Sequence, residues 1–177
     1  MINFRKLSAI VWLISALSFS AHGQDSLPVP PSSKDLLFYL QRSTNANTVI
    51  YELQHADTTV DTKNPVHPSW ILYAKKGEKE DLDYIQRKFA YGIKSNKIAD
   101  NDYELKFVSY DKYKLELMRG ADNKLHVYTT INNKKAILTR IYLKIEGGTF
   151  WFPHIEYVEV FGIDPSNNAI VKERIKV

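Results

Sequence analysis

The chain has 177 residues, with 24 lysines and arginines, 20 aspartates and glutamates, and no cysteine. Without cysteine it has no disulfide framework, no cysteine nucleophile and no cysteine for lipid attachment. Positive and negative residues alternate along the chain, which argues against nucleic-acid binding because that requires a clustered basic face. A chain of this length is expected to form one domain with a sizeable core.

The first 23 residues have the pattern of a secretory signal peptide. Arg5 and Lys6 precede an apolar run, Leu7 to Phe19, and Ala21-His22-Gly23 supplies a small-x-small cleavage site. The apolar run is shorter than the roughly 20 residues that span a membrane. We therefore expect an exported, soluble protein, periplasmic or secreted, with no membrane span after cleavage. Its formal charge would fall from +4 to +2, because two basic residues and no acidic ones are removed.

Residues 24–34 are expected to form an extended, proline-rich lead-in, because Pro28, Pro30 and Pro31 lack amide donors. Residues 35–177 read as a single β-rich domain. At its start, KDLLFYLQR and TVIYELQ alternate with period two and flank a turn-rich segment, 43–47. This pattern predicts a β-hairpin with a loop of about five residues.

One helix is predicted, at roughly residues 79–91. Leu82, Ile85 and Phe89 form an apolar stripe at helical spacing, so we expect Phe89 to fill the core. The acidic residues at 78, 80 and 81 would occupy the first turn, where the helix dipole favours negative charge. Gly92 would end the helix in the left-handed conformation.

The rest of the chain alternates as strands do. Asn132-Asn133 predicts a hairpin turn, because asparagine tolerates positive φ. The strand that follows would point Ile137, Thr139 and Ile141 to one side, and the aromatic run 150–163 would occupy the centre of the sheet. About nine strands with one helix predict a mainly β fold, an antiparallel β-sandwich or β-barrel. Periodicity is compatible with either closure.

Aromatic residues supply the first candidate site. Tyr84, Arg87 and Tyr91 share the face of the predicted helix opposite its apolar stripe, and Trp70 and Trp151 lie in aromatic strands. Tyrosine offers contact area at low entropic cost, so these five residues are candidates for binding a ligand or partner. The alternative is that they pack against a second layer of the fold, since β-proteins are rich in aromatic residues.

His154 and Glu156 supply a weaker, second candidate. Their i,i+2 spacing places them on one strand face, and His67 or His126 could complete a metal site. The alternative is that His154 and Glu156 lie at a strand edge beside Pro153, where their polar side chains are simply solvated. No phosphate loop, nucleophile elbow or zinc-protease motif occurs.

Glu159 lies on the opposite strand face from Glu156 and within an apolar segment. The two residues are therefore not a paired acid and base. We expect one of them to be buried against Arg140 or Lys144. The other interpretation is a general acid with a raised pKa.

A family resemblance is carried by three segments: PVPPSSKDLLFYLQRSTNANTVIYEL (28–53), NPVHPSWILYA (64–74) with the later IQRKFAYGI (85–93), and FPHIEYVEVFG (152–162). The chain resembles domain of unknown function 4833, a family of exported bacterial proteins. This resemblance covers nearly all of the mature chain. It implies export and a single domain, and it implies no activity and no catalytic residues.

These observations favour a non-enzymatic binding module, without a cofactor, for a small apolar molecule, a glycan or an envelope protein. The alternative is a metal-dependent or acid/base hydrolase that uses His67, His154 and Glu156.

The signal peptide leads to a direct prediction. Because cleavage is expected after Gly23, the mature protein should begin at Gln24 or within a residue or two of it. Intact-mass measurement of the exported protein checks this, and a mass that retains the apolar run 7–19 would contradict it.

Overall fold

The structure is a computed structural model that describes residues 27–149 and 152–177. The predicted signal peptide and Trp151 lie outside the described residues. The elements are β1 (Leu36–Arg42), β2 (Asn45–Leu53), β3 (His55–Ala56), β4 (Thr59–Val60), β5 (Val66–Leu72), the 3-10 turn η1 (Tyr73–Lys75), β6 (Glu78–Asp81), α1 (Tyr84–Phe89), β7 (Ile93–Ala99), β8 (Asp102–Phe107), β9 (Leu115–Arg119), β10 (Leu125–Ile131), β11 (Lys134–Gly148), β12 (Pro153–Ile163) and β13 (Ile170–Lys176). In this described part, no helix has the length and hydropathy needed to cross a membrane.

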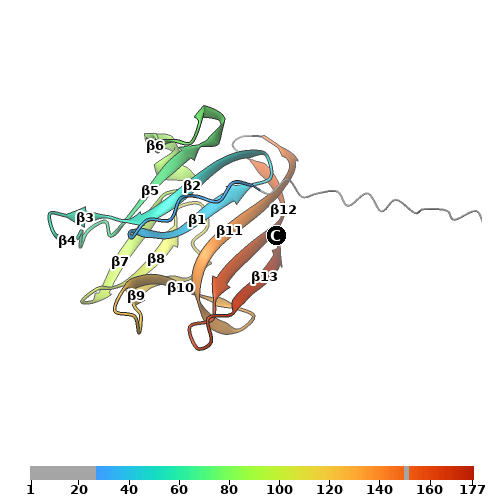
Figure 1. The fold of residues 1–177 in the computed structure, drawn as a ribbon. Coiled ribbons are helices and arrows are strands. Elements are labelled where there is room, and N and C mark those ends of the chain that lie inside the picture. The colour runs from blue at the N-terminus through green and yellow to red at the C-terminus, as the bar shows by residue number, and fades with distance from the viewer. Residues whose placement is uncertain (1–26, 150–151) are drawn as a thin grey trace, which may run out of the picture.

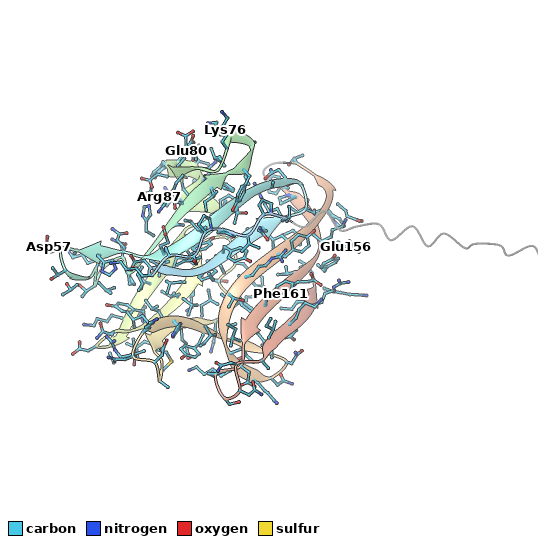
Figure 2. All side chains as sticks on the ribbon, viewed as in Figure 1. Asp57, Lys76, Glu80, Arg87, Glu156 and Phe161 are labelled. Carbon is cyan, nitrogen blue, oxygen red and sulfur yellow. The ribbon has the colours of Figure 1, made fainter. Side chains whose placement is uncertain are left out.

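One curled sheet of eleven strands makes up most of the fold (Figure 1). Nine strands follow one path, β6-β5-β2-β1-β11-β10-β9-β8-β7, and β12 and β13 attach beside β11. The path curls into a half-barrel. The small β3–β4 hairpin projects from one end, with Asp57 at its tip (Figure 2).

The long strand β11 joins two arms of the sheet. Its first residues pair with β10, and residues 140–143 pair with β1. Strand β12 pairs along β11 from Ile137 to Gly148, so β10 and β1 must share the opposite edge of β11. The sheet therefore divides at β11 into one arm of β1, β2, β5 and β6 and another of β10 to β7.

The core lies between the two arms. Phe38 of β1 stacks on Tyr51 of β2 with a centroid distance of 4.3 Å. Phe107 of β8 meets both rings edge-on, at 6.2 Å and 5.8 Å. Each such aromatic contact adds roughly 0.5–1.5 kcal/mol to the effect of burying the rings. These three side chains therefore pin one arm to the other.

The mainly β fold is confirmed, with one difference in strand direction. Every pair in the large sheet is antiparallel except β1–β11, which is parallel, so the sheet is mixed. Local alternation predicts only neighbours joined by short turns, whereas strands β2 to β10 lie between β1 and β11 in the chain. The predicted β1–β2 hairpin is confirmed, with a connection of Ser43 and Thr44 instead of five residues. Asn132 and Asn133 take positive φ in the β10–β11 turn, as predicted.

The predicted helix is wrong in its first half. Residues 78–81 form β6 and pair with β5, and helix α1 begins only after Asp83. Asp83 and Gln86 form a capping box there, each side chain accepting a hydrogen bond from the other's backbone amide. Leu82 precedes the helix and is buried, while Phe89 is 59% exposed. The prediction that Phe89 fills the core is therefore wrong.

The alternation predicted for β11 fails at one point. The pairing with β12 shifts register between Leu138 and Arg140, a β-bulge that reverses the side-chain direction. Ala136 and Leu138 consequently face the core before the bulge, and Ile141 faces it afterwards. The centre of the sheet is β11, whereas the aromatic run 150–163 was expected there.

The lead-in is held to the outside of the sheet at one point. The side-chain amide of Gln41, which is buried, donates to the carbonyl oxygen of Pro28 at 2.8 Å. The same amide also reaches the Thr48 hydroxyl at 3.2 Å.

The residues around α1 provide a stability test. Leu82→Ala should lower the free energy of unfolding by about 2–5 kcal/mol, because Leu82 is 3% exposed. Phe89→Ala should cost no more than about 0.5 kcal/mol, because its ring is mostly in solvent. Denaturant melts of the two variants check this, and a larger loss for Phe89→Ala would contradict the placement of α1.

Candidate functional site

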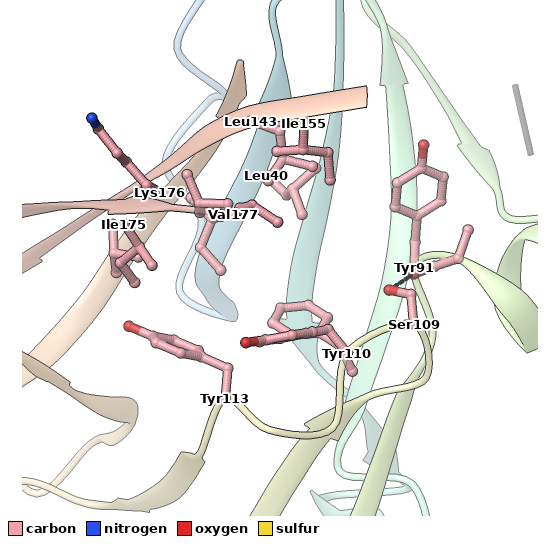
Figure 3. A pocket seen from close by; sticks show the side chains of 15 residues that line it. Leu40, Tyr91, Ser109, Tyr110, Tyr113, Leu143, Ile155, Ile175, Lys176 and Val177 are labelled. Carbon is pink, nitrogen blue, oxygen red and sulfur yellow. Dashed lines mark hydrogen bonds between the residues drawn. The ribbon is translucent and has the colours of Figure 1, made fainter. Parts of the chain in front are cut away.

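A cleft opens on the concave side of the half-barrel. Its inner hollow has a volume of about 290 Å³ (Figure 3). Aliphatic side chains from four strands line it: Leu40 of β1, Ile141 and Leu143 of β11, Val158 and Val160 of β12, and Ile175 of β13. Tyr110 and Tyr113 close it from the loop between β8 and β9, and the Lys176 side chain points away from it. Most of the wall is therefore apolar.

An outer hollow of about 600 Å³ continues from the inner one. The two hollows share the lining residues Ala90, Tyr91, Ser109, Leu143 and Ile155, so they form one cleft. The outer part is more polar, with Arg42, Thr44, Asn45 and Thr149 in its wall. Ile85 and Phe89 of α1 line it as well.

The end of α1 is fixed to the β8–β9 loop, and the two together form one wall of the cleft. The Ser109 hydroxyl donates to the Ala90 carbonyl at 2.7 Å, and the Val108 amide donates to the Gly92 carbonyl at 3.0 Å. Gly92 does not take the expected left-handed conformation. A glycine is required there because a Cβ would lie 1.9 Å from the Arg87 carbonyl oxygen. The glycine therefore allows the chain to turn closely from the helix into β7.

Tyr91 is the residue that links the cleft to the core. Its ring packs edge-on against Trp70 at 5.1 Å, and its carbonyl oxygen accepts a hydrogen bond from the buried Tyr51 hydroxyl at 3.0 Å. Arg42 donates to the Tyr91 hydroxyl and lies over both rings, 5.0 Å from the Trp70 centroid and 5.4 Å from that of Tyr91. Burial raises the pKa of Tyr91, and the Arg42 charge only partly opposes this, so the phenol stays neutral.

The residues of the aromatic candidate site lie in different surroundings. Trp70 is buried, and its indole nitrogen donates to the Gln86 side chain at 3.0 Å. Tyr91 reaches the cleft, whereas Tyr84 is 70% exposed and contacts Lys88. Arg87 donates to the Leu82 carbonyl at 3.1 Å. Of the four candidates among the described residues, only Tyr91 lines the cleft.

The residues of the candidate metal site are not brought together. His67 of β5 pairs with Asp81 at 2.8 Å and lowers the pKa of that carboxyl through the hydrogen bond. His154 and Glu156 are exposed on β12, and strands β2, β1 and β11 lie between β5 and β12. His126 pairs with Asp122. Among the described residues, no three histidine, aspartate or glutamate side chains gather as metal ligands would.

Glu159 is buried on the convex face of β12 rather than in the cleft. It is 4% exposed and accepts hydrogen bonds from Arg174 at 2.8 Å and Lys172 at 3.3 Å. Burial by itself would raise the pKa of Glu159, but these hydrogen bonds and positive charges outweigh it and lower the pKa. The partners are on β13, so the expected pairing with Arg140 or Lys144 is wrong, as is a general acid with a raised pKa.

The residue that sequence reasoning missed is Arg42. It continues the alternation of Phe38 and Leu40, two residues further along β1, and so places a charge on the core side of the strand. The sequence signal for Arg42 is a positively charged residue at a position where the alternation of the strand predicts an apolar one.

The fold and cleft define a β-rich half-barrel domain with a largely apolar cavity, and a fold by itself does not imply a function. A family model confirms the resemblance seen in the sequence: it matches residues 38–174 and is described as Domain of unknown function (DUF4833). The chain therefore belongs to the DUF4833 family. No curated protein and no solved structure matches it.

The ion pairs of Glu159 lead to a pH-dependent prediction. Because folding lowers the pKa of this carboxyl below its ordinary value of 4.5, its stabilising effect is present above that value and is lost as pH falls through the folded pKa. Glu159→Gln should cost about 1–3 kcal/mol at pH 7, and the difference from the natural protein should shrink towards about pH 3. Urea melts at both pH values measure it.

The matched control is Glu156→Gln, because Glu156 is on the same strand but exposed. This substitution should leave the free energy of unfolding nearly unchanged at either pH. A cost for Glu159→Gln that stays constant with pH would contradict the assignment.

Proposed function

We propose that this domain binds a small apolar molecule in the cleft and acts by binding rather than by catalysis. The observation that carries the proposal is the lining of the inner hollow. Leu143, Ile155, Val158 and Ile175 are only partly buried there, so apolar surface remains uncovered inside a concave site. Covering such surface is favourable by roughly 25 cal/mol per Å².

The cleft favours a small apolar molecule over the other two ligand classes expected from the sequence. A glycan needs polar groups for its hydroxyls, whereas the inner hollow is lined mainly by aliphatic side chains, and Trp70 is buried beneath Arg42 and Tyr91. An envelope protein would use a broad surface, whereas the uncovered aliphatic residues here line a hollow. His67 gives no support to the hydrolase alternative, because its ring is hydrogen-bonded to Asp81. We also propose that the domain works after export, on the basis of the residue pattern at 1–23.

Replacement of a lining residue tests the proposal. Nile red, a neutral apolar dye, should bind the natural protein, and Leu143→Gln should weaken binding about tenfold by placing an amide in the apolar wall. Fluorescence titration measures both affinities. Leu53→Gln is the matched control, because Leu53 is also a partly buried leucine packed against the core but does not line the cleft.

Leu53→Gln should leave the dye affinity unchanged at a similar cost in melting temperature. Absence of dye binding to the natural protein, or equal weakening by both variants, would overturn the proposed function.

A further inference from the structure

The cleft contains one feature that an apolar ligand does not use, a cation at its outer end. We propose that the natural ligand is an amphiphile with an anionic head group, which Arg42 binds in the outer hollow while the apolar tail fills the inner hollow. This inference rests on the proposed function and specifies the chemistry of its ligand.

Strand register directs Arg42 to the concave side. In the parallel pairing of β1 with β11, Leu40 lies opposite Ile141 and Arg42 lies opposite Leu143. Residues directly opposite each other point to the same face of a sheet. Leu40, Ile141 and Leu143 line the inner hollow, so the Arg42 side chain leaves the sheet on that same side, at its outer end.

The neighbours of Arg42 leave its charge without an anionic partner. Its guanidinium donates to the Tyr91 hydroxyl and, at 3.5 Å, to the Asn45 side-chain oxygen, and both acceptors are neutral. The Nε atom is buried and has no hydrogen-bond acceptor among the described residues. Within residues 27–149 and 152–177, Arg42 forms no ion pair. No aspartate or glutamate side chain in these ranges lines either hollow.

A missing counter-ion alone does not single out Arg42, because Arg140 shares that property. Arg140 stacks between Tyr142 and Phe161 on the convex face, and its Nε atom is also buried without an acceptor. It faces away from the concave side, however, and lines neither hollow. What distinguishes Arg42 is that its guanidinium borders a cavity large enough for a ligand.

Polarity is segregated along the cleft in the way that an amphiphile requires. Around Arg42 the wall contains the hydroxyls of Thr44 and Thr149 and the amide of Asn45. Beyond the shared residue Leu143 the wall is mainly aliphatic and aromatic, with Val158 and Ile175 at its inner end. A head group would thus meet hydrogen-bond donors, and a tail would meet carbon.

The guanidinium also explains why the head group should be an anion. It carries a permanent charge and rigidly arranged donors, and hydrogen bonds between charged groups are roughly twice as strong as neutral ones. The rings of Trp70 and Tyr91 hold Arg42 in place beforehand, so little side-chain freedom is lost when a ligand binds. A carboxylate and a phosphate satisfy this site through the same chemistry.

Three probes with the same tail test the inference: dodecanoate, dodecyl phosphate and dodecanol. The two anions are titrated into the natural protein below their micelle concentrations, and dodecanol below its solubility limit. Isothermal titration calorimetry should show at least one of the two anions binding about tenfold or more tightly than the alcohol. The anion that binds more tightly identifies the kind of head group. This comparison needs no variant, so it stands even if a substitution at Arg42 prevents folding.

Arg42→Met should remove the preference for the anion and leave the affinity for dodecanol unchanged. Arg140→Met is the matched control, because it removes a stacked arginine from the other face of the same sheet. It should retain the preference, and thermal melts establish that both variants are folded.

The outcomes separate this inference from the function on which it rests. Equal binding of all three probes to the natural protein would overturn the anionic head group. An anion preference that survives Arg42→Met would overturn the assignment of that head group to Arg42. Both outcomes leave the apolar ligand in place. Failure of every probe and of Nile red to bind would overturn both.

Discussion

The fold depends on one strand that serves two partners along a single edge. Strand β11 pairs with β10 over its first residues and with β1 further along, while β12 occupies its other edge. Two strands that share an edge must diverge as they leave it, so the sheet separates into arms that curl towards each other. The contacts of Phe107 with Phe38 and Tyr51 hold these arms together. The cleft lies on the concave side of the same strand.

Tyr91 connects the core to the wall of the cleft. Its backbone oxygen is fixed by Tyr51, a core residue, while its ring and hydroxyl fix Trp70 and Arg42 at the outer hollow. The wall of the cleft is thereby positioned by the same side chains that close the core. A site held by packed neighbours loses little freedom on binding, which favours recognition of a ligand by a preformed shape.

Two charged side chains are neutralised to different extents on the two faces of the sheet. On the convex face Glu159 is enclosed by Arg174 and Lys172, so its charge is compensated within the protein. On the concave face, among the residues that the structure describes, the partly buried Arg42 contacts aromatic rings and neutral oxygens and forms no ion pair. Burying a charge is costly unless it is paired, and the convex pair meets that requirement internally. On the concave face, the proposed anionic head group would supply the missing partner.

The sequence by itself determined the β-rich class, the β1–β2 and β10–β11 hairpins and the family, because these follow from alternation, turn residues and segments that are local in the chain. Only the tertiary structure decided the parallel β1–β11 pair, the bulge at Leu138–Arg140 and the strand at 78–81, where the sequence pattern predicts a helix. The cleft belongs to this second group. Leu40, Tyr91, Leu143 and Ile175 are far apart in the chain, and their convergence depends on strand pairings whose register no local pattern specifies.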